Sequence, residues 1–572
     1  MLLRRLKEYA DERMDMPPTL YSETPVRYII ELDAAGRLLT PQPTDTADPS
    51  SPSTKRGQRY LMPQVTRAAG IKPLLLADKS DYTLGIGSES AKPDRVRACH
   101  QAYQELLTRC AAKTDDPSVH AVVAFLANEP TAKLQLSDEF DYGATIAFRV
   151  DGTFPTNLAA VRAFWAAEHD PGSTGAHMMQ CIVCGQERPV LDRLQGKIKG
   201  IPGGQMSGTS IISANAGAFE SYGLEASLIA PTCADCGERF TKALNHLISD
   251  RQSHTLLGGA IFVYWTRKDV GFDLYEPLDK PQPQQVQDLI TNFLKGKPQP
   301  GVDDTAFYAT TLSASGGRAV IRDWIDTTVG AVKANLARWF LRQQIVDAYG
   351  APARPLNLYG LAVATVRESK DLPTTTPRTL LRAALTGAPL PLGMLYQAVR
   401  RSRADQDVTH ARAALITLVL RSQSPEIQED RMSALDLQNT APAYLYGRLL
   451  AVLAEVQRAA IGKAAIIDRF YGTASSAPAS VFARLLRGAQ PHLTKLERDK
   501  PGVAKALQRR LEEVMSEIDG FRTTLTLEEQ GFFALGYYHQ RAHDRAQIQA
   551  AIERKRAGTA SADETEIAET AE

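Results

Sequence analysis

The sequence predicts a multidomain α+β protein, with a mixed α/β N-terminal half, an inserted four-cysteine region and an all-α C-terminal bundle. Three observations predict this class. Short β-branched or alternating runs, such as 144–150 and 260–265, occur in the N-terminal half, whereas alanine, leucine and arginine recur at helical spacing from about residue 378. Two C-x-x-C-G pairs lie between the early strands. The length of 572 residues also favours several cores over one.

Composition sets the broad class. Charged residues make up 23% and apolar residues 44% of the chain, as in ordinary globular proteins. The net charge is +1, so a surface that binds a polyanion must be local. Six cysteines in so long a chain do not make a disulfide framework, and neither a signal peptide nor an 18-residue apolar run is visible. We expect a cytoplasmic protein with no membrane partner.

The N-terminal elements are short. We expect, in order, a helix, a strand, a polar loop, a second helix and two strands, at residues 1–12, 27–32, 40–58, 94–112, 144–150 and 260–265. Cys99 and Cys110 suit two buried positions on similar faces of the second helix. Pro-rich breaks follow at 277–300 and 372–377.

These patterns divide the chain into five segments. We expect a mixed α/β region at 1–175, a zinc-knuckle and glycine-rich region at 176–250, an α/β continuation at 251–377, a helical bundle at 378–555 and a disordered acidic tail at 556–572.

The paired cysteines are the strongest chemical signal. They form the sequences Cys-Ile-Val-Cys-Gly and Cys-Ala-Asp-Cys-Gly, with ligands Cys181, Cys184, Cys233 and Cys236. In each pair we expect the glycine to let the backbone turn, so that amide groups point toward the sulfurs. Four thiolates are the set that structural Zn²⁺ prefers, whereas two chance pairs would be buried as small apolar residues. A zinc deaminase needs a His-x-Glu element, and the nearby His177 has no glutamate two residues later. The pattern favours structural zinc.

Between the pairs lies a basic, glycine-rich stretch, residues 197–208. Lys197 and Lys199 can neutralise phosphates, Ser207 offers a hydroxyl, and Gly203-Gly204-Gln205 places a polar side chain on permissive backbone. It is not a P-loop, because no Gly-Lys-Ser/Thr follows. The alternative is a flexible surface loop with solvated lysines.

In the C-terminal half, arginines accompany apolar stripes. They either form solvated helix faces or follow a phosphate backbone. His539 and His543 have the spacing of a metal pair, but Gln540 replaces the metalloprotease glutamate, which favours helix packing. No motif for a nucleophile, a kinase or a nuclease is visible in the sequence.

Several segments in order resemble the large subunit of the type I-C (Dvulg subtype) CRISPR Cascade complex, over nearly the whole chain. The segments are Lys197–Gly200 through Gly204-Gln205 to Phe219-Glu-Ser-Tyr-Gly223, Ala314–Arg318 with Ile321–Trp324, Tyr396-Gln-Ala398, Pro442–Tyr444 with Gly447-Arg-Leu449, Pro478–Phe482 and Leu527–Gly531 with Gly536–Tyr538.

The resemblance implies a non-catalytic, DNA-binding role in RNA-guided antiviral defence. Such a subunit recognises a short protospacer-adjacent motif (PAM) in duplex DNA and promotes R-loop formation, while base pairing to the guide reads the rest. The implied partners are the CRISPR RNA-bearing backbone and guide-processing subunits, target duplex and displaced strand, and a helicase-nuclease that cuts later. The helical bundle from about residue 432 is implied to resemble the small subunit of other Cascades. It is also implied that the same gene can yield this segment as a separate small subunit, starting near Met432.

Two groups of residues are therefore predicted to contact DNA. The first, near the PAM duplex, is Lys55, Arg56, Arg59, Lys72, Lys197, Lys199, Gly203, Gly204, Gln205 and Ser207. The second, on the small-subunit-like helices, is Arg448, Arg484, Arg487, Lys495 and Arg498. The alternatives are a zinc-stapled nucleic-acid-processing enzyme and a single-strand-binding scaffold that ignores flanking motifs.

Overall fold

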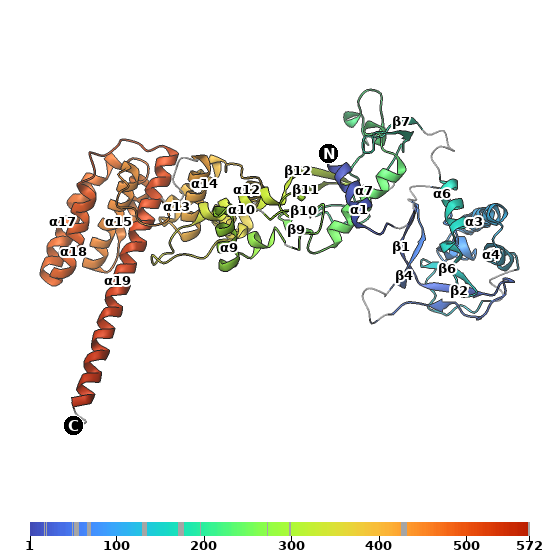
Figure 1. Ribbon diagram of the computed structural model, residues 1–572, viewed down its shortest axis with the longest axis horizontal. Helices are drawn as coiled ribbons and strands as arrows, with labels where there is room; N and C mark the ends of the chain where they lie inside the picture. Colours follow the sequence, from blue (N-terminus) through green and yellow to red (C-terminus); the bar gives the residue numbers. More distant parts are fainter. Residues whose placement is uncertain are drawn as a thin grey trace. The chain divides into compact units, whose positions relative to one another are not determined.

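The computed structural model divides into two compact units (Figure 1). Unit 1 is Met1–Ser253 with Leu312–Arg322, and unit 2 is His254–Thr311 with Asp323–Glu572. The structure describes residues 1–569 except for 17, 19, 49, 51–55, 66–69, 129–133, 170–176, 195, 215, 272, 297–298 and 425–431, and side chains only as far as 554. The predicted boundary at 250/251 lies close to a unit boundary, whereas those at 175/176 and 377/378 fall inside units.

The first part of unit 1 is a four-stranded sheet with helices on its core side. The strand order is β3-β2-β6-β5, in which β2 and β6 are parallel and both outer pairs are antiparallel. Cys99 and Cys110 are buried on α3, as their spacing predicts. The elements are β2 (Tyr28–Leu32), β3 (Thr44–Asp45), β5 (Ala77–Lys79), α2 (Ser80–Thr83), α3 (Pro93–Thr114), α4 (Pro117–Ala127), β6 (Thr145–Val150) and α6 (Ala159–Glu168).

The second part of unit 1 is built around one amphipathic helix, α7 (Ala234–Ser249). Helix α1 (Leu2–Arg13) packs along it. Strands β1 (Tyr21–Val26) and β4 (Gln58–Pro63) form an antiparallel ribbon, and β7 (Met178–Gln180) pairs with β8 (Glu187–Pro189) in a short hairpin.

Unit 2 joins a sheet to a helical assembly through one continuous apolar core. The sheet has the order β12-β11-β10-β9, and the turn of its β11–β12 hairpin is grouped with unit 1. The strands are β9 (His254–Leu257), β10 (Ala260–Thr266), β11 (Ala306–Ser315) and β12 (Arg318–Thr328). The helices before the last bundle are α8 (Glu276–Asp279), α9 (Pro283–Leu294), α10 (Val329–Gln343), α11 (Leu358–Val363), α12 (Thr375–Thr386), α13 (Leu392–Asp405) and α14 (His410–Gln423).

The last bundle surrounds α15 (Pro442–Ile461), which is buried on every side along most of its length. Its partners are α16 (Ala465–Ala474), α17 (Phe482–Asp499), α18 (Pro501–Met515) and α19 (Leu527–Glu569). Two glycines let α15 and α19 meet backbone to backbone. A Cβ on Gly447 would lie 2.0 Å from the Phe533 carbonyl oxygen, and one on Gly536 would lie 2.1 Å from that of Tyr444.

Two features of this region differ from the sequence-based expectation. Helix α19 continues to Glu569, into the segment for which composition predicts a disordered tail; alanine and glutamate there are good helix formers. The small-subunit-like segment is also not isolated, since α19 packs on α13 and α14 as well as on α15. Among the described residues, no helix has the length and apolar character needed to cross a membrane.

The glycine crossing generates a stability prediction. Gly447→Ala or Gly536→Ala forces a methyl group into backbone atoms that cannot rotate away, so the loss should be at least the ~1–3 kcal/mol typical of overpacking. Thermal unfolding measures it. Gly488→Ala in α17 is the matched control: nothing lies within 4 Å of its Cβ position, and alanine there should be stabilising by about 0.5–1 kcal/mol. Equal melting temperatures for all three variants would contradict the close crossing.

Candidate functional site

The first cysteine pair lies on the turn between β7 and β8. Cys181 N–H donates to the Gln186 carbonyl at 2.9 Å, and Gly185 N–H donates to the Cys181 carbonyl at 2.8 Å. Gly185 has φ +74°, a left-handed conformation that glycine adopts without strain. This pair is therefore the glycine-supported turn that the sequence predicts.

The second pair has a different local structure. Cys233 is the N-cap of α7, and Cys236 lies in its first turn. Gly237 is helical here and not part of a left-handed turn; a Cβ at this position would lie 2.6 Å from Leu194 Cδ2. The expectation that both glycines serve a turn is thus wrong for this pair, in which glycine makes room for Leu194.

The fold brings all four sulfur atoms together. The Sγ atoms of Cys181, Cys184, Cys233 and Cys236 lie within 4.8 Å of one another. A β-bridge between Val190 and Cys233 joins the two pairs, and Cys233 N–H lies 3.5 Å from Cys181 Sγ. Burial raises the pKa of the Cys181 thiol, but hydrogen bonds from backbone amides, that of Cys184 foremost, outweigh it and lower the pKa to about 7. The arrangement can bind a metal ion.

The basic loop is a compact hairpin anchored on α7. Ile198 and Thr209 exchange two backbone hydrogen bonds of 2.8 Å. Asn245 of α7 accepts from Lys199 N–H and donates to the Lys197 carbonyl, both at 2.9 Å. A Cβ on Gly208, which has φ +96°, would meet Lys197 Cβ at 2.8 Å. The ordered bonding does not fit the alternative of a flexible loop.

The far side of this loop meets the β11–β12 turn. Ser210 N–H donates to the Gly317 carbonyl at 2.8 Å, and the Ser210 carbonyl accepts from Ala319. A Cβ on Gly317 would lie 3.2 Å from Gln205 Oε1. Gln205 is exposed at this turn beside Gly203 and Gly204, and these three residues do not line the groove described next.

A groove of about 990 Å³ in unit 1 brings several of the predicted residues together. It is bordered by β1, the end of α6, one face of α7 and the basic loop. Arg59, Lys197 and Lys199 line it, and none of them has a carboxylate partner among the described residues. Lys197 Nζ instead donates to Ser210 Oγ at 2.6 Å. Ser207 also lines the groove. The lining carries four cations, counting Lys242, against the three carboxylates of Glu23, Asp235 and Glu238, so its excess of positive charge is small.

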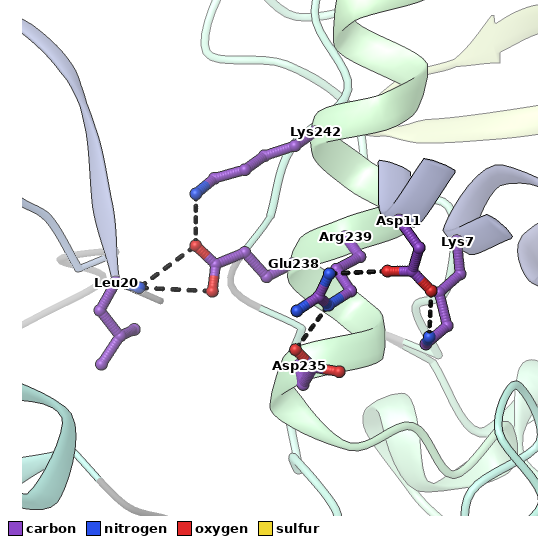
Figure 2. Close-up of polar contacts among 7 residues, drawn as sticks. All are labelled: Lys7, Asp11, Leu20, Asp235, Glu238, Arg239 and Lys242. Atoms are coloured by element: carbon purple, nitrogen blue, oxygen red, sulfur yellow. Dashed lines mark hydrogen bonds and ion pairs between the residues drawn. The ribbon is translucent and has the colours of Figure 1, made fainter. Parts of the chain in front are cut away.

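Polar contacts on α7 hold the two sides of this groove in place (Figure 2). Glu238 accepts from Leu20 N–H at 3.2 Å and pairs with Lys242 at 2.5 Å, which ties α7 to the start of β1. On its other side, Arg239 bridges Asp235 on α7 and Asp11 on α1. The same helix that carries two cysteines thus positions the groove.

The remaining N-terminal candidates are more dispersed. Lys55 lies outside the described residues. Arg56 and Lys72 are exposed and do not line the groove, although the charge of Lys72 acts on His169, which does. Sequence reasoning missed Glu238, Lys242 and Asn245. Their spacing after Cys233 puts them on one helical face, and that periodicity was the available signal.

Comparison with known families decides the identity of the chain. A model described as CRISPR-associated protein (Cas_Csd1) matches residues 2–544. The chain belongs to the Cas_Csd1 family. No curated protein matches the sequence.

In this Cas_Csd1 protein, the C-terminal candidates divide into one buried and four exposed residues. Arg448 is 4% exposed and donates to Gln540 Oε1 at 3.1 Å, so its prediction as a phosphate contact is corrected: α15 is the buried central helix. The others share the face of α17 opposite its buried residues. They are Arg484, Arg487, Lys495 and Arg498. His539 is buried against Tyr444, at 3.0 Å from its hydroxyl, consistent with helix packing.

Asn245 provides a test of how the loop is anchored. Asn245→Ala removes both hydrogen bonds to the loop, each of which contributes about 0.5–1.5 kcal/mol. Because the loop then opens more easily, amide hydrogen exchange at Ile198 and Thr209 should become roughly tenfold faster or more. Hydrogen exchange with mass spectrometry measures this. Asn245→Asp is the matched variant, since it can still accept from Lys199 and should lie between the two. Unchanged exchange in Asn245→Ala would show that α7 does not anchor the loop.

Proposed function

We propose that this protein is the DNA-binding large subunit of a type I-C CRISPR surveillance complex. Membership of the Cas_Csd1 family supports a role in CRISPR defence. The observation that carries the proposal is the groove, into which Arg59, Lys197 and Lys199 converge from separate parts of the sequence. Cations without carboxylate partners attract phosphates and release counterions on binding.

In this proposal, unit 1 holds the PAM duplex. Lysines and Arg59 contact the backbone, which sets register without reading sequence. Gln205, exposed at the β11–β12 turn, is suited to a base edge, because an amide side chain offers both a donor and an acceptor. Local opening of the duplex there starts the R-loop, which base pairing to the guide extends.

The cationic face of α17 provides a second contact. Arg484, Arg487 and Lys495 have no carboxylate partner among the described residues, whereas Arg498 pairs with Asp499 at 2.9 Å. A row of such cations on one side of a helix suits a single strand through its phosphates. We assign it to the displaced or target strand, in a complex with the guide-bearing subunits.

The four thiols fit structural Zn²⁺. A cluster within 4.8 Å matches an ion bonded to each sulfur at about 2.3 Å. Four protein ligands close the coordination sphere, so the ion would supply stability and no chemistry. We propose that the subunit is non-catalytic, with cutting left to a helicase-nuclease recruited after R-loop formation.

Metal analysis tests the zinc assignment. The purified chain should contain one Zn²⁺, and Cys233→Ser should lose it together with protection of the β7–β8 hairpin, since metal binding and folding are linked. Cys99→Ser is the control, because Cys99 is equally buried but lies outside the cluster. A chain without stoichiometric zinc would overturn the assignment.

Binding measurements test the DNA contacts. Lys197→Ala or Lys199→Ala should weaken binding of the assembled complex to all duplexes alike and reduce the salt slope by about 1 each, whereas Gln205→Ala should change discrimination among flanking motifs. Lys113→Ala, an exposed lysine on α3, is the control. Unchanged affinity of both lysine variants across a salt series would remove the groove from the DNA path.

The separate small subunit is tested by mass spectrometry. We expect a fragment beginning near Met432 to co-purify with the complex, and Met432→Leu to abolish it, whereas Met394→Leu should not. Both methionines are buried, so leucine is a near-isosteric replacement at each. The fragment would lack α13 and α14, on which α19 packs, and needs a partner surface there. A complex that forms R-loops without the fragment would refute the separate product.

A further inference from the structure

The size and lining of the groove narrow the form of DNA that it can hold. At about 990 Å³ it lies at the upper end of the range of small-ligand sites, about 300–1,000 Å³. A site of this volume can enclose one or a few nucleotides, whereas a duplex can only lie across its open side. Apolar side chains, among them Val65, Leu191 and Leu194, contribute to the lining beneath the cations. Apolar surface suits the face of a base more than it suits a phosphate.

We propose that this groove binds one or a few unpaired nucleotides, with their bases against the apolar lining and their phosphates on Lys197 and Lys199. The inference rests on the proposed function, in which the basic loop contacts the PAM duplex. The unpaired nucleotides in the groove would then be the first ones released when that duplex opens.

Two of the three cations, Lys197 and Arg59, have a hydrogen-bond partner among the described residues before any ligand binds. Lys197 is fixed by Ser210, and Arg59 Nη1 lies 3.3 Å from the Glu23 carbonyl at the edge of β1. A guanidinium has five N–H donors, so Arg59 keeps others for a phosphate. Side chains fixed in this way lose little conformational freedom on binding, which favours a defined path for the strand.

His169 supplies a group that can contact a base edge. Its Nδ1 lies 3.1 Å from the Trp165 carbonyl oxygen, which can only accept, so Nδ1 carries the proton. Burial lowers the pKa of the imidazole, and the ring is neutral near pH 7. Nε2 is then an acceptor on a residue that lines the groove, and an acceptor is complementary to an exocyclic amino group of adenine or cytosine.

The test measures the affinity of the full chain for three DNA duplexes by fluorescence anisotropy. One duplex is blunt, and each of the other two carries a three-nucleotide overhang at a different end. The overhang at one end should raise affinity about tenfold. Ala167→Trp, on an exposed position of α6 that lines the groove, should remove most of this gain and weaken binding of the overhang duplex several-fold more than binding of the blunt duplex. Ala163→Trp is the matched control, since Ala163 is exposed on the same helix but does not line the groove.

An overhang of abasic nucleotides, which keeps the phosphates and lacks the bases, distinguishes the contribution of the bases to affinity from that of the phosphates. Loss of the gain with abasic sites supports a base in the groove, and full retention overturns it. The inference is also overturned if neither overhang adds affinity, or if Ala167→Trp weakens the blunt duplex as much as the overhang. Failure of the proposed function gives a different result: no binding of the blunt duplex, with a gain from unpaired nucleotides that still depends on Ala167.

Discussion

The organisation of unit 1 depends on the junction between the four cysteine thiols and the start of α7. The β7–β8 hairpin supplies two thiols and α7 supplies the other two, across the long insert of residues 185–232. Burial at the start of α7 raises the pKa of the Cys233 and Cys236 thiols, whereas backbone hydrogen bonds lower that of Cys181. Closing this junction fixes both ends of the insert, and the insert contains the basic loop.

Helix α7, which carries two of the four cysteines, also positions the walls of the groove. Successive turns of α7 carry Glu238, Lys242 and Asn245 on one face. These side chains contact Leu20, Tyr21 and the loop backbone, and so fix the two walls of the groove. The charge of the whole chain is nearly zero, and the groove has a small local excess of positive charge. Its lining combines Arg59, Lys197, Lys199 and Lys242 with the carboxylates of Glu23, Asp235 and Glu238. In the proposed function, a metal ion held by the four cysteines would thereby support recognition of DNA without taking part in chemistry.

Local patterns in the sequence predict many of the helices and strands and the cysteine set. They do not predict contacts between segments that are far apart in the sequence. The helix at 94–112, the strands at 144–150 and 260–265, and the cysteine set follow from periodicity and spacing. The different role of Gly237 was not predictable, because it depends on Leu194 from another segment. Arg448 reads as one more helical arginine, and only the burial of α15 on all sides shows that its guanidinium is in the core. The convergence of Arg59 with Lys197 likewise depends on tertiary structure.

A cryo-EM map of the assembled complex on duplex bearing its flanking motif tests the central claim most directly. The account predicts DNA density in the groove bordered by β1, α7 and the basic loop, with a phosphate within ion-pair distance of Lys197 or Lys199. It also predicts one ion at the four cysteines. A map in which the duplex and both of its strands pass elsewhere, with this groove empty, would contradict it.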